Sequence, residues 1–326
     1  MLRQMGTLLI ERKDFFLGLL AEHLGISLTA ILIAVVLGGL VGILISEFDR
    51  SAKPTLAVIN FLYTIPSISM LGFLIPFSGV GNATAVIALT VYALLPMVRN
   101  THTGIANVDP AILEAAKGMG STRMQILIKV RLPLAMPVIM SGIRSMVTMT
   151  IALAGIASFI GAGGLGVAIY RGITTNNSAM TMAGSVLIAA LALVVDFILG
   201  FVEKRMQKRS ARARRTNRIL GAGAAVICVC LLITSLLGRQ TGDTIRIATK
   251  PMTEQYVLGE MLKILIEKDT DLQVELTQGV GGGTSNIQPA MESGEVDLYP
   301  EYTGTAWNMV MKEEGLYTEK VFDDLQ

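Results

Sequence analysis

The sequence predicts an all-α polytopic membrane domain of about six transmembrane helices, followed by a smaller α/β lobe. Hydrophobic residues make up 52% of the 326 residues and charged residues only 16%, which excludes a soluble globular protein of this length. Apolar runs long enough to cross about 30 Å of hydrocarbon recur as far as Leu237. After Gly238, charged and polar residues interleave with short apolar stretches, as they do in a soluble α/β domain.

Six apolar runs are the candidate membrane spans. They cover residues 24–46, 56–75, 84–98, 134–160, 180–201 and 219–237. We expect Pro66 and Pro76 to kink the second span and Pro96 to kink the third, because proline removes a backbone donor. No cleaved signal peptide is expected, since charged residues 11–14 interrupt the first segment.

The distribution of basic residues sets the expected orientation. Arginine and lysine crowd residues 204–218 and the loop 99–131, so both should be cytoplasmic. Counting spans from these loops places the N-terminus and everything after Leu237 outside the cytoplasm. A basic cluster beside membrane spans indicates topology and anionic lipid rather than nucleic acid.

Residues 109–133 form a polar, basic hinge between two apolar runs. Asp109 can cap a helix that begins at Pro110, and Gly120 follows the end of that helix. Ser121 can cap a second helix that runs to Val130. The sequence therefore predicts two short helices with the shape of a docking surface, although an ordinary amphipathic connector has the same pattern.

The hinge resembles the EAA loop of permease subunits from binding-protein-dependent ABC importers. The residues that carry this resemblance are Glu114, Ala115, Ala116, Gly120, Val130, Leu132 and Pro133, with Val130 where the family usually has Ile. The resemblance implies the ABC permease fold over residues 1–203 and an ABC ATPase subunit docked on residues 109–133. It also implies a homodimer, with ATP and Mg bound by the partner ATPase and not by this chain.

The sequence predicts a βαβαβ lobe in the last part of the chain. Residues 204–242 would form a basic cytoplasmic link, an extra span and a short external linker, and the lobe would cover residues 243–326. We expect strands at residues 244–248, 272–276 and 296–299 in a mostly parallel sheet. Helices are expected at 253–267, with Thr253 as the cap, and at 284–293 and 305–312.

The expected carboxyl ends of these strands bring together chemistry suited to a small zwitterion. They are Lys250, the glycine run 279–283 with Thr284, and residues 299–305. Lys250, Thr305 and a helix N-terminus can take a carboxylate, while Tyr299, Tyr302 or Trp307 can offer ring faces to a quaternary ammonium. The alternative is that the aromatic residues belong to the core and Lys250 is solvated.

Three motifs in this lobe, T-K-P-M-T-E-Q-Y, G-G-G-T and D-L-Y-P-E-Y-T-G-T, resemble the first lobe of binding proteins for glycine betaine, choline, carnitine and related solutes, including ergothioneine. By position, the resemblance makes Lys250, Tyr302 and Thr305 the stronger ligand candidates, with Glu254, Gln255 and Tyr299 beside them. A binding protein of two lobes needs about 200 residues or more. We therefore expect this lobe to be incomplete and the sequence to be a fragment.

Within the membrane, Arg144 and Asp196 are charges that mark either an ion pair or a pathway. Gly161, Gly163 and Gly166 match a dinucleotide-binding pattern, but they follow an apolar helix rather than a strand, so a re-entrant turn or close helix packing is the better interpretation.

We find no metal spacing, no nucleotide-binding signature and no catalytic set, and expect no enzyme.

The two resemblances together imply the membrane-spanning and solute-binding subunit of an ATP-driven importer for quaternary-ammonium or betaine solutes in a bacterial cytoplasmic membrane. A membrane-anchored sensor that binds the solute without moving it is an alternative. An ABC importer of another amino acid is a second, because such importers share the permease motif. An ion-coupled carrier would need more intramembrane carboxylates than Asp196.

Overall fold

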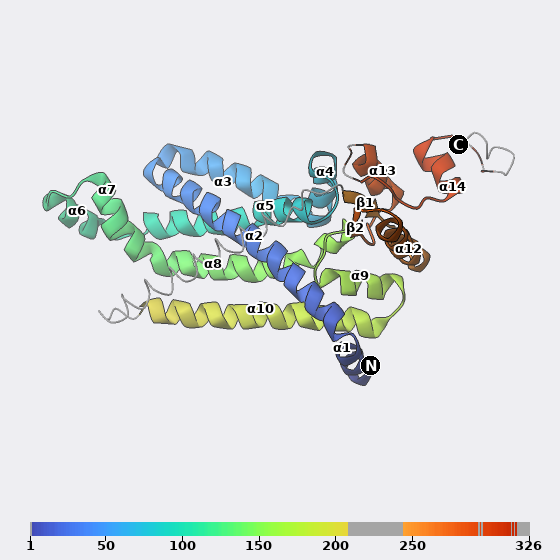
Figure 1. Cartoon of the computed structure of the whole chain (residues 1–326). Coiled ribbons are helices and arrows are strands. Elements are labelled where there is room, and N and C mark those ends of the chain that lie inside the picture. Colours follow the sequence, from blue (N-terminus) through green and yellow to red (C-terminus); the bar gives the residue numbers. More distant parts are fainter. Residues whose placement is uncertain are drawn as a thin grey trace.

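A computed structural model describes residues 2–207, 244–292, 294, 296–313, 315 and 317. It confirms the predicted fold class, because a bundle of long helices carries a small α/β lobe at one end (Figure 1). The membrane domain comprises α1 (Leu2–Glu11), α2 (Lys13–Glu47), α3 (Asp49–Thr64), α4 (Ser67–Ser78), α5 (Asn82–Ala106), α6 (Pro110–Gly118), α7 (Arg123–Ile126), a π-helical turn (Leu127–Arg131), α8 (Leu132–Ala154), a 3₁₀ turn (Ala157–Phe159), α9 (Gly166–Thr174) and α10 (Ser178–Gln207).

Four helical stretches in the described residues are long and apolar enough to cross a membrane. They are Lys13–Glu47, Asn82–Ala106, Arg123–Phe159 and Ser178–Arg205. Three of them contain an expected span, and Arg123–Phe159 covers the span expected at 134–160 except for its last residue. The expected span 56–75 is different, since it is broken into Arg50–Thr64 and Ser67–Ser78, which meet at 98°. The sixth expected span, 219–237, lies outside the described residues.

The break between α3 and α4 has a local cause. Pro66 has no N–H and disfavours a helical conformation in the residue before it, so the helix ends at Thr64. The hydroxyl of Tyr92 on α5 donates a hydrogen bond to the carbonyl of Ile65, which the break leaves without a helical partner. Pro66 thus bends the chain far more than a kink would, whereas Pro76 and Pro96 lie inside α4 and α5.

The long helices pack through small side chains. Ala30 and Ala34 of α2 and Ala93 of α5 are fully buried where these two helices meet. Small residues allow close helix approach where hydrophobicity alone provides little driving force. α8 packs against α5 on one side and α10 on the other, while α2 crosses α5 and α8 (Figure 1).

The glycine-rich segment after α8 forms a turn and the short helix α9, not a dinucleotide site. Its backbone is held by side chains from other helices. Asn82 accepts a hydrogen bond from the N–H of Gly163 at 2.8 Å, and Glu22 accepts one from Gly164 at 3.0 Å. His23 lies 2.9 Å from the carbonyl of Ile151, near the end of α8. These contacts satisfy backbone groups that the end of the helix leaves without partners.

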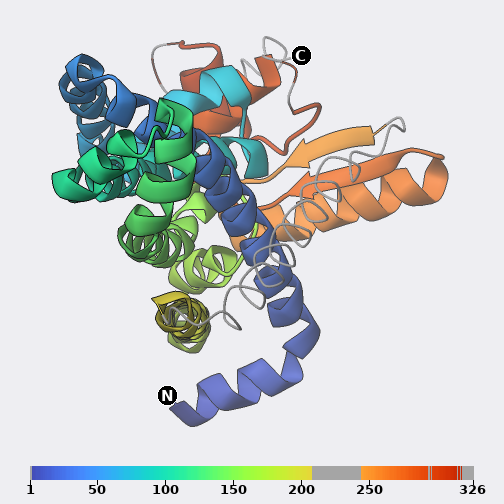
Figure 2. The ribbon, with the colours of Figure 1, turned by 90° about the vertical axis from the view of Figure 1, so that its left-hand side faces the viewer.

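The lobe comprises β1 (Thr244–Ala248), α12 (Thr253–Asp269), β2 (Gln273–Thr277), α13 (Thr284–Glu292), α14 (Thr303–Thr305) and a π-helical turn (Ala306–Val310). β1 and β2 pair in parallel, with Ile245 opposite Val274, as expected for a βαβ unit. Figure 2, viewed from the end of the bundle that carries α6, shows the strands and α12 projecting to one side.

Three details of the lobe differ from the sequence predictions. The helix expected at 305–312 is the short α14 followed by a π-helical turn that ends at Val310. The third strand, expected at 296–299, is reduced in the described residues to one parallel bridge between Leu298 and Ile247 of β1. Thr253 is not the cap of α12; Met252 occupies that position and makes no side-chain bond there. The loop that carries α6 lies at the opposite end of the bundle from the lobe, and α1 lies on the lobe's side (Figure 1).

Candidate functional site

The carboxyl ends of β1 and β2 are tied together by backbone hydrogen bonds. The N–H of Thr249 donates to the carbonyl of Thr277 at 2.9 Å, and the N–H of Val280 donates to the carbonyl of Thr249 at 2.8 Å. These bonds bring Lys250, after β1, next to the glycine run after β2. Ligand sites in open α/β sheets form at such an edge.

Lys250 and Glu301 form an ion pair at the centre of this rim. Nζ of Lys250 donates to Oε1 of Glu301, and the hydroxyl of Thr284 donates to Oε2 at 2.6 Å. The backbone N–H of Tyr302 also donates to Oε1, at 2.7 Å. The side chains of Lys250 and Glu301 are only 4% and 15% exposed. The lysine expected to be free for a ligand carboxylate is therefore paired with a carboxylate of the chain itself.

The hydrogen bonds around Glu301 decide its charge. Burial opposes ionisation of Glu301, but the bonds from Lys250, Thr284 and the backbone of Tyr302 outweigh burial and hold the pKa of Glu301 below its ordinary value. Glu301 is therefore ionised at neutral pH.

Three further candidates surround the ion pair. Nζ of Lys250 lies 5.2 Å from the ring centroid of Tyr302, within cation–π range. The hydroxyl of Tyr302 donates to Oε1 of Glu254 at 2.8 Å. Gln255 is fully buried, and its Oε1 accepts a long bond of 3.5 Å from the backbone N–H of Lys250. Its Nε2 has no partner among the described residues, so one buried donor is left at the rim.

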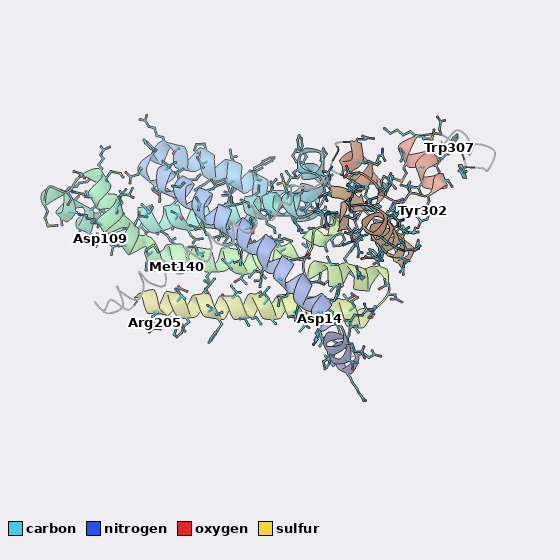
Figure 3. All side chains as sticks on the ribbon, viewed as in Figure 1. Asp14, Asp109, Met140, Arg205, Tyr302 and Trp307 are labelled. Carbon is cyan, nitrogen blue, oxygen red and sulfur yellow. The ribbon has the colours of Figure 1, made fainter. Side chains whose placement is uncertain are left out.

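The remaining candidates lie beside this cluster. The hydroxyl of Tyr299 donates to Gln288 of α13 at 2.8 Å, and burial, followed by the charge of Glu301, raises the pKa of Tyr299 to about 12. Thr305 ends α14 and is half-buried. Trp307 follows in the π-helical turn, and its buried Nε1 has no hydrogen-bond partner in the part of the chain that the structure describes. Figure 3 shows Tyr302 and Trp307 at the lobe end of the molecule.

The glycine run also carries the contact between the lobe and the membrane domain. The N–H of Gly281 donates to the carbonyl of Phe159 at 2.6 Å, and Val280 forms an antiparallel bridge with Ile160. A Cβ at Gly281 would collide with that carbonyl, so the close approach requires glycine. Val80 of the membrane domain packs against the lobe's own buried cluster. The run that borders Lys250 is thus also the docking contact.

Arg171 of α9 joins three elements at the same interface. Its Nη2 donates to Oε1 of Gln278 at 2.5 Å, and Nε2 of Gln278 donates to Glu260 of α12 at 2.6 Å. The guanidinium carbon lies 4.8 Å from the ring centroid of Tyr256 and 5.4 Å from that of Phe15. Cation–π contacts of this kind favour a cation that is partly shielded from water.

The expected hinge loop is a pair of short helices at the other end of the bundle, where Figure 3 shows Asp109. Asp109 caps α6 by accepting from the N–H of Ala111 at 2.9 Å, and Pro110 is the first helical residue. Gly120 has a φ of +79°, a conformation that favours glycine.

The second helix of the hinge begins one residue later than predicted. Thr122, and not Ser121, caps α7, because the Thr122 hydroxyl accepts from the N–H of Gln125 and the Gln125 side chain accepts from the N–H of Thr122 at 2.9 Å. α7 ends at Ile126 and not at Val130, and the helical backbone continues through the π-helical turn into α8, which starts at Leu132.

The hinge presents an apolar surface outside the bundle. Glu114 and Ala115 are exposed, while Ala116 is buried. Large exposed apolar side chains on the hinge are Ile112, Met119, Met124 and Ile128. A patch of this kind is typical of an interaction site.

The structure brings Arg144 and Asp196 together within the membrane. Nε and Nη2 of Arg144 donate to the two carboxylate oxygens of Asp196 at 2.5 and 2.6 Å. Nη1 of Arg144 also donates to Glu203 at 3.4 Å. This two-bond geometry is the strong form of an arginine–carboxylate pair.

Several contributors were not among the expected site residues. Glu301 lies within the recognised run D-L-Y-P-E-Y, and its position after the third expected strand could have paired it with Lys250. Nothing in the local sequence marks Arg171 or Glu203 as partners of distant elements. No cluster of three or more potential metal ligands occurs in the described ranges.

Residues 30–208 match the family described as "Binding-protein-dependent transport system inner membrane component". This match covers more than half of the chain. The chain belongs to this family. Members are multi-pass membrane components of transport systems and are not themselves enzymes. Residues 243–324 match the "Substrate binding domain of ABC-type glycine betaine transport system", so a binding region is fused to the permease component.

Curated relatives share this organisation in whole or in part. The ergothioneine transport permease/ergothioneine binding protein EgtU of Helicobacter pylori strain G27 is 37% identical over 298 residues, which is 89% of this chain and 53% of that protein. The chain therefore spans about half the length of that relative. The carnitine transport permease protein OpuCB of Listeria monocytogenes is 41% identical over 60% of this chain and 89% of its own length.

Solved structures support the fold of the membrane part. The MetNI methionine ABC transporter in an inward-facing conformation aligns with a TM-score of 0.53 and 25% identity over 57% of this chain and 94% of that chain. An amino acid ABC transporter solved with histidines aligns with a TM-score of 0.51 over 60% of this chain and 96% of that chain. At 23% identity, the second match shows the fold alone.

We predict that Glu301→Gln destabilises the lobe by about 3–5 kcal/mol at pH 7, because it leaves Lys250 buried without a counter-charge. The lowered pKa of Glu301 means that the pair stabilises the native lobe above about pH 4.5, the ordinary value, and that this stabilisation is lost as the pH falls through the lower folded pKa. Denaturant unfolding of the whole chain, followed by the fluorescence of Trp307, its single tryptophan, measures both effects.

The control is Glu275→Gln, which removes an exposed carboxylate from β2. The control should unfold like the parent both at pH 7 and at a pH below the folded pKa of Glu301. Equal stability of Glu301→Gln and the control at pH 7 would show that the ion pair contributes nothing.

We predict that Arg171→Ala loosens the docking of the lobe. The change removes one charged hydrogen bond and two cation–π contacts, together about 2–4 kcal/mol, so amide hydrogen exchange in residues 278–283 should rise at least tenfold. Arg205→Ala is the control, because Arg205 makes a cation–π contact with Phe201 at the far end of α10. Unchanged exchange in Arg171→Ala would rule out the role of Arg171 in docking.

Proposed function

We propose that this chain is the membrane-spanning and solute-binding subunit of an ATP-driven ABC importer for quaternary-ammonium or betaine solutes. The observation that carries the proposal is that one chain holds an exposed apolar hinge at one end and a charged, aromatic-lined rim at the other. The rim supports this solute class, and so do the relatives, whose names specify ergothioneine, carnitine, choline and glycine betaine.

The hinge α6–α7 is the surface on which an ABC ATPase subunit would dock. Its exposed methionine and isoleucine side chains suit an apolar groove on a partner, and Gly120, with its positive φ, lies in the turn between the two helices. ATP and Mg would be bound and turned over by that partner. Two copies of this chain, with two ATPase subunits, would form the transporter in a bacterial cytoplasmic membrane, with the lobe outside.

The rim can bind both ends of a betaine. A trimethylammonium group has no N–H to donate, so it is recognised by aromatic faces and by carboxylates, which Tyr302 and Glu301 supply. The ligand carboxylate would then take the place of Glu301 at Lys250 and could accept from the free Nε2 of Gln255. Lys250 thus exchanges Glu301 for the ligand carboxylate, and Glu301 exchanges Lys250 for the ligand ammonium group.

Solute binding is tested on the whole chain in lipid nanodiscs with glycine betaine, choline, carnitine, ergothioneine and, as a comparison, proline. We expect one of the first four to change the fluorescence of Trp307 at saturating concentration, and Lys250→Gln to weaken that solute at least tenfold. Lys268→Gln, on the exposed end of α12, is the matched control. No response to any of the four from a folded lobe would discard the betaine proposal and leave an importer of another amino acid.

Coupling is tested separately with the ATPase subunit present. We expect Glu114→Ala and Gly120→Val to reduce ATP-dependent uptake at least tenfold, because the first alters the exposed surface of α6 and the second strains a backbone with positive φ. Solute binding at the lobe should be unchanged in both. Lys53→Ala, an exposed change on α3, should transport normally. Loss of solute binding in the hinge variants would contradict the assignment.

A further inference from the structure

α8 has one packed face and one open face. Ile139, Gly142, Met146 and Thr150 are buried in the core that α8 shares with α2, α5 and α10. On the other side the described chain leaves a stripe uncovered. We call it the open face of α8; it comprises Ser141, Arg144, Ser145, Thr148, Met149 and Ala152. The spacing of three and four residues places all six on one side of the helix.

The open face borders a hollow that extends to α10. The hollow has a volume of about 520 Å³ and is lined by the open face together with Asp196. Ser141, Ser145 and Ala152 are exposed, and the side chains of Arg144 and Asp196 remain 38% and 31% exposed although they are paired with each other. Small-molecule sites typically have volumes of about 300–1,000 Å³.

This face cannot lie against lipid tails. It sits in the middle of a span, yet it presents two serines, a threonine and an ion pair, and exposed charges within the hydrocarbon region are costly. In membrane proteins such groups face the protein interior or a water-filled cavity. Elsewhere on α10, Val194, Phe197 and Phe201 are exposed and apolar, as expected of a surface in contact with lipid.

The groups along the hollow are arranged in order from the lobe side to the hinge side. Tyr63 of α3, 39% exposed, donates from its hydroxyl to the sulfur of Met149 at 3.3 Å and therefore places an aromatic ring beside the outer part of the open face. Thr148 follows, and then Arg144 with Asp196. Glu203 lies nearest the hinge side, at 3.4 Å from Arg144. The two carboxylates exceed the one guanidinium by one negative charge, which favours a solute that carries a cation.

We propose that the open face of α8, with Asp196 and Glu203, lines the path of the solute through the membrane and holds a zwitterion there by partner exchange. The carboxylate of the solute takes Arg144, while its ammonium group takes Asp196. Tyr63 and Glu203 border the path on the lobe side and on the hinge side of this pair. This proposal rests on the proposed function as an importer, and it adds a second solute site, within the membrane, to the rim of the lobe.

Partner exchange explains why the ion pair can serve a transport path. Removing one member of a pair in a low-dielectric site costs about 3–5 kcal/mol, because the other charge is left alone. A zwitterion replaces both partners at once, so no charge is left unpaired during the exchange. A choline-like cation can engage only the carboxylates, and the excess negative charge of the site accommodates it. Binding remains weak enough for release because the pair re-forms when the solute leaves.

The test uses single cysteines in the whole chain with its ATPase partner, reconstituted in lipid nanodiscs. Cys228 and Cys230, the only native cysteines, are first changed to serine. Ser145→Cys and Thr148→Cys lie on the open face. Val194→Cys is the matched control, because Val194 is 56% exposed but lies two residues from Asp196 and so on another side of α10. The probe is a water-soluble methanethiosulfonate that bears a trimethylammonium group.

We expect the two open-face cysteines to react at least tenfold faster than Val194→Cys, since thiols react as thiolates in water and not in hydrocarbon. A saturating amount of the solute that binds the lobe should slow the reaction at least threefold. Reaction no faster than in the control would overturn the proposal and show that lipid or a second copy covers the face. Fast reaction without protection would overturn the solute site, since it shows water but no bound solute.

These outcomes are separable from failure of the proposed function. If no solute binds the lobe and no ATP-dependent uptake occurs, the importer assignment fails before the cysteines are examined. If binding and uptake are normal in the variants while the cysteines are inert, only the intramembrane site fails.

Discussion

The structure depends on one constraint, which is that every backbone polar group within a membrane must find a partner in the protein. Regular helices satisfy the constraint by themselves, but within the described residues the helical backbone is interrupted between α3 and α4 and again after α8. At the first break the hydroxyl of Tyr92 bonds the carbonyl of Ile65, and at the second Glu22 and Asn82 accept from glycine N–H groups. Each break is thus supported by a side chain from a different helix, and the breaks in turn fix how α2, α5 and α8 pack.

The second break also provides the backbone groups against which the lobe docks. The turn after α8 leaves the carbonyl of Phe159 and the edge of Ile160 free to pair with Gly281 and Val280. These backbone contacts require only that residue 281 be glycine. Arg171 adds contacts that depend on particular side chains, a hydrogen bond to Gln278 and a cation–π contact with Tyr256. The loop that contacts the membrane domain is continuous with the loop beside Lys250, so solute chemistry and docking lie within one short segment.

The parts that could be predicted from the sequence are those set by local chemistry. Asp109 and Pro110 start α6 because their preferences act over two or three residues, and β1 follows from simple alternation. The start of α7 was predicted one residue early; the pattern of Thr122 followed by Gln125 three residues later is the better capping signal. Pro66 predicted a kink, whereas the two helices meet at 98°, and the carbonyl of Ile65 at this break is bonded by Tyr92, 27 residues further along the chain.

The site was harder to predict because its contacts join distant residues. Lys250 and Glu301 are 51 residues apart, and Arg144 and Asp196 are 52 apart. Charge in an apolar run was enough to single out Arg144 and Asp196, whereas Glu203 lies where a span meets a basic region and looks like an ordinary surface residue. The third strand was expected as part of a βαβαβ lobe, yet a strand needs a neighbour along its length, and this segment meets β1 at one step only.

The length of α2 has a mechanical consequence. At 1.5 Å per residue its 35 residues measure about 50 Å, well beyond the thickness of the hydrocarbon region. Toward the lobe side Glu22 accepts a hydrogen bond from the glycine turn, and near the hinge-side end Ser46 lies 3.2 Å from the ring of His102 on α5. Because α2 is one unbroken helix with contacts at both places, it connects the hinge side of the bundle directly to the turn that supports the lobe.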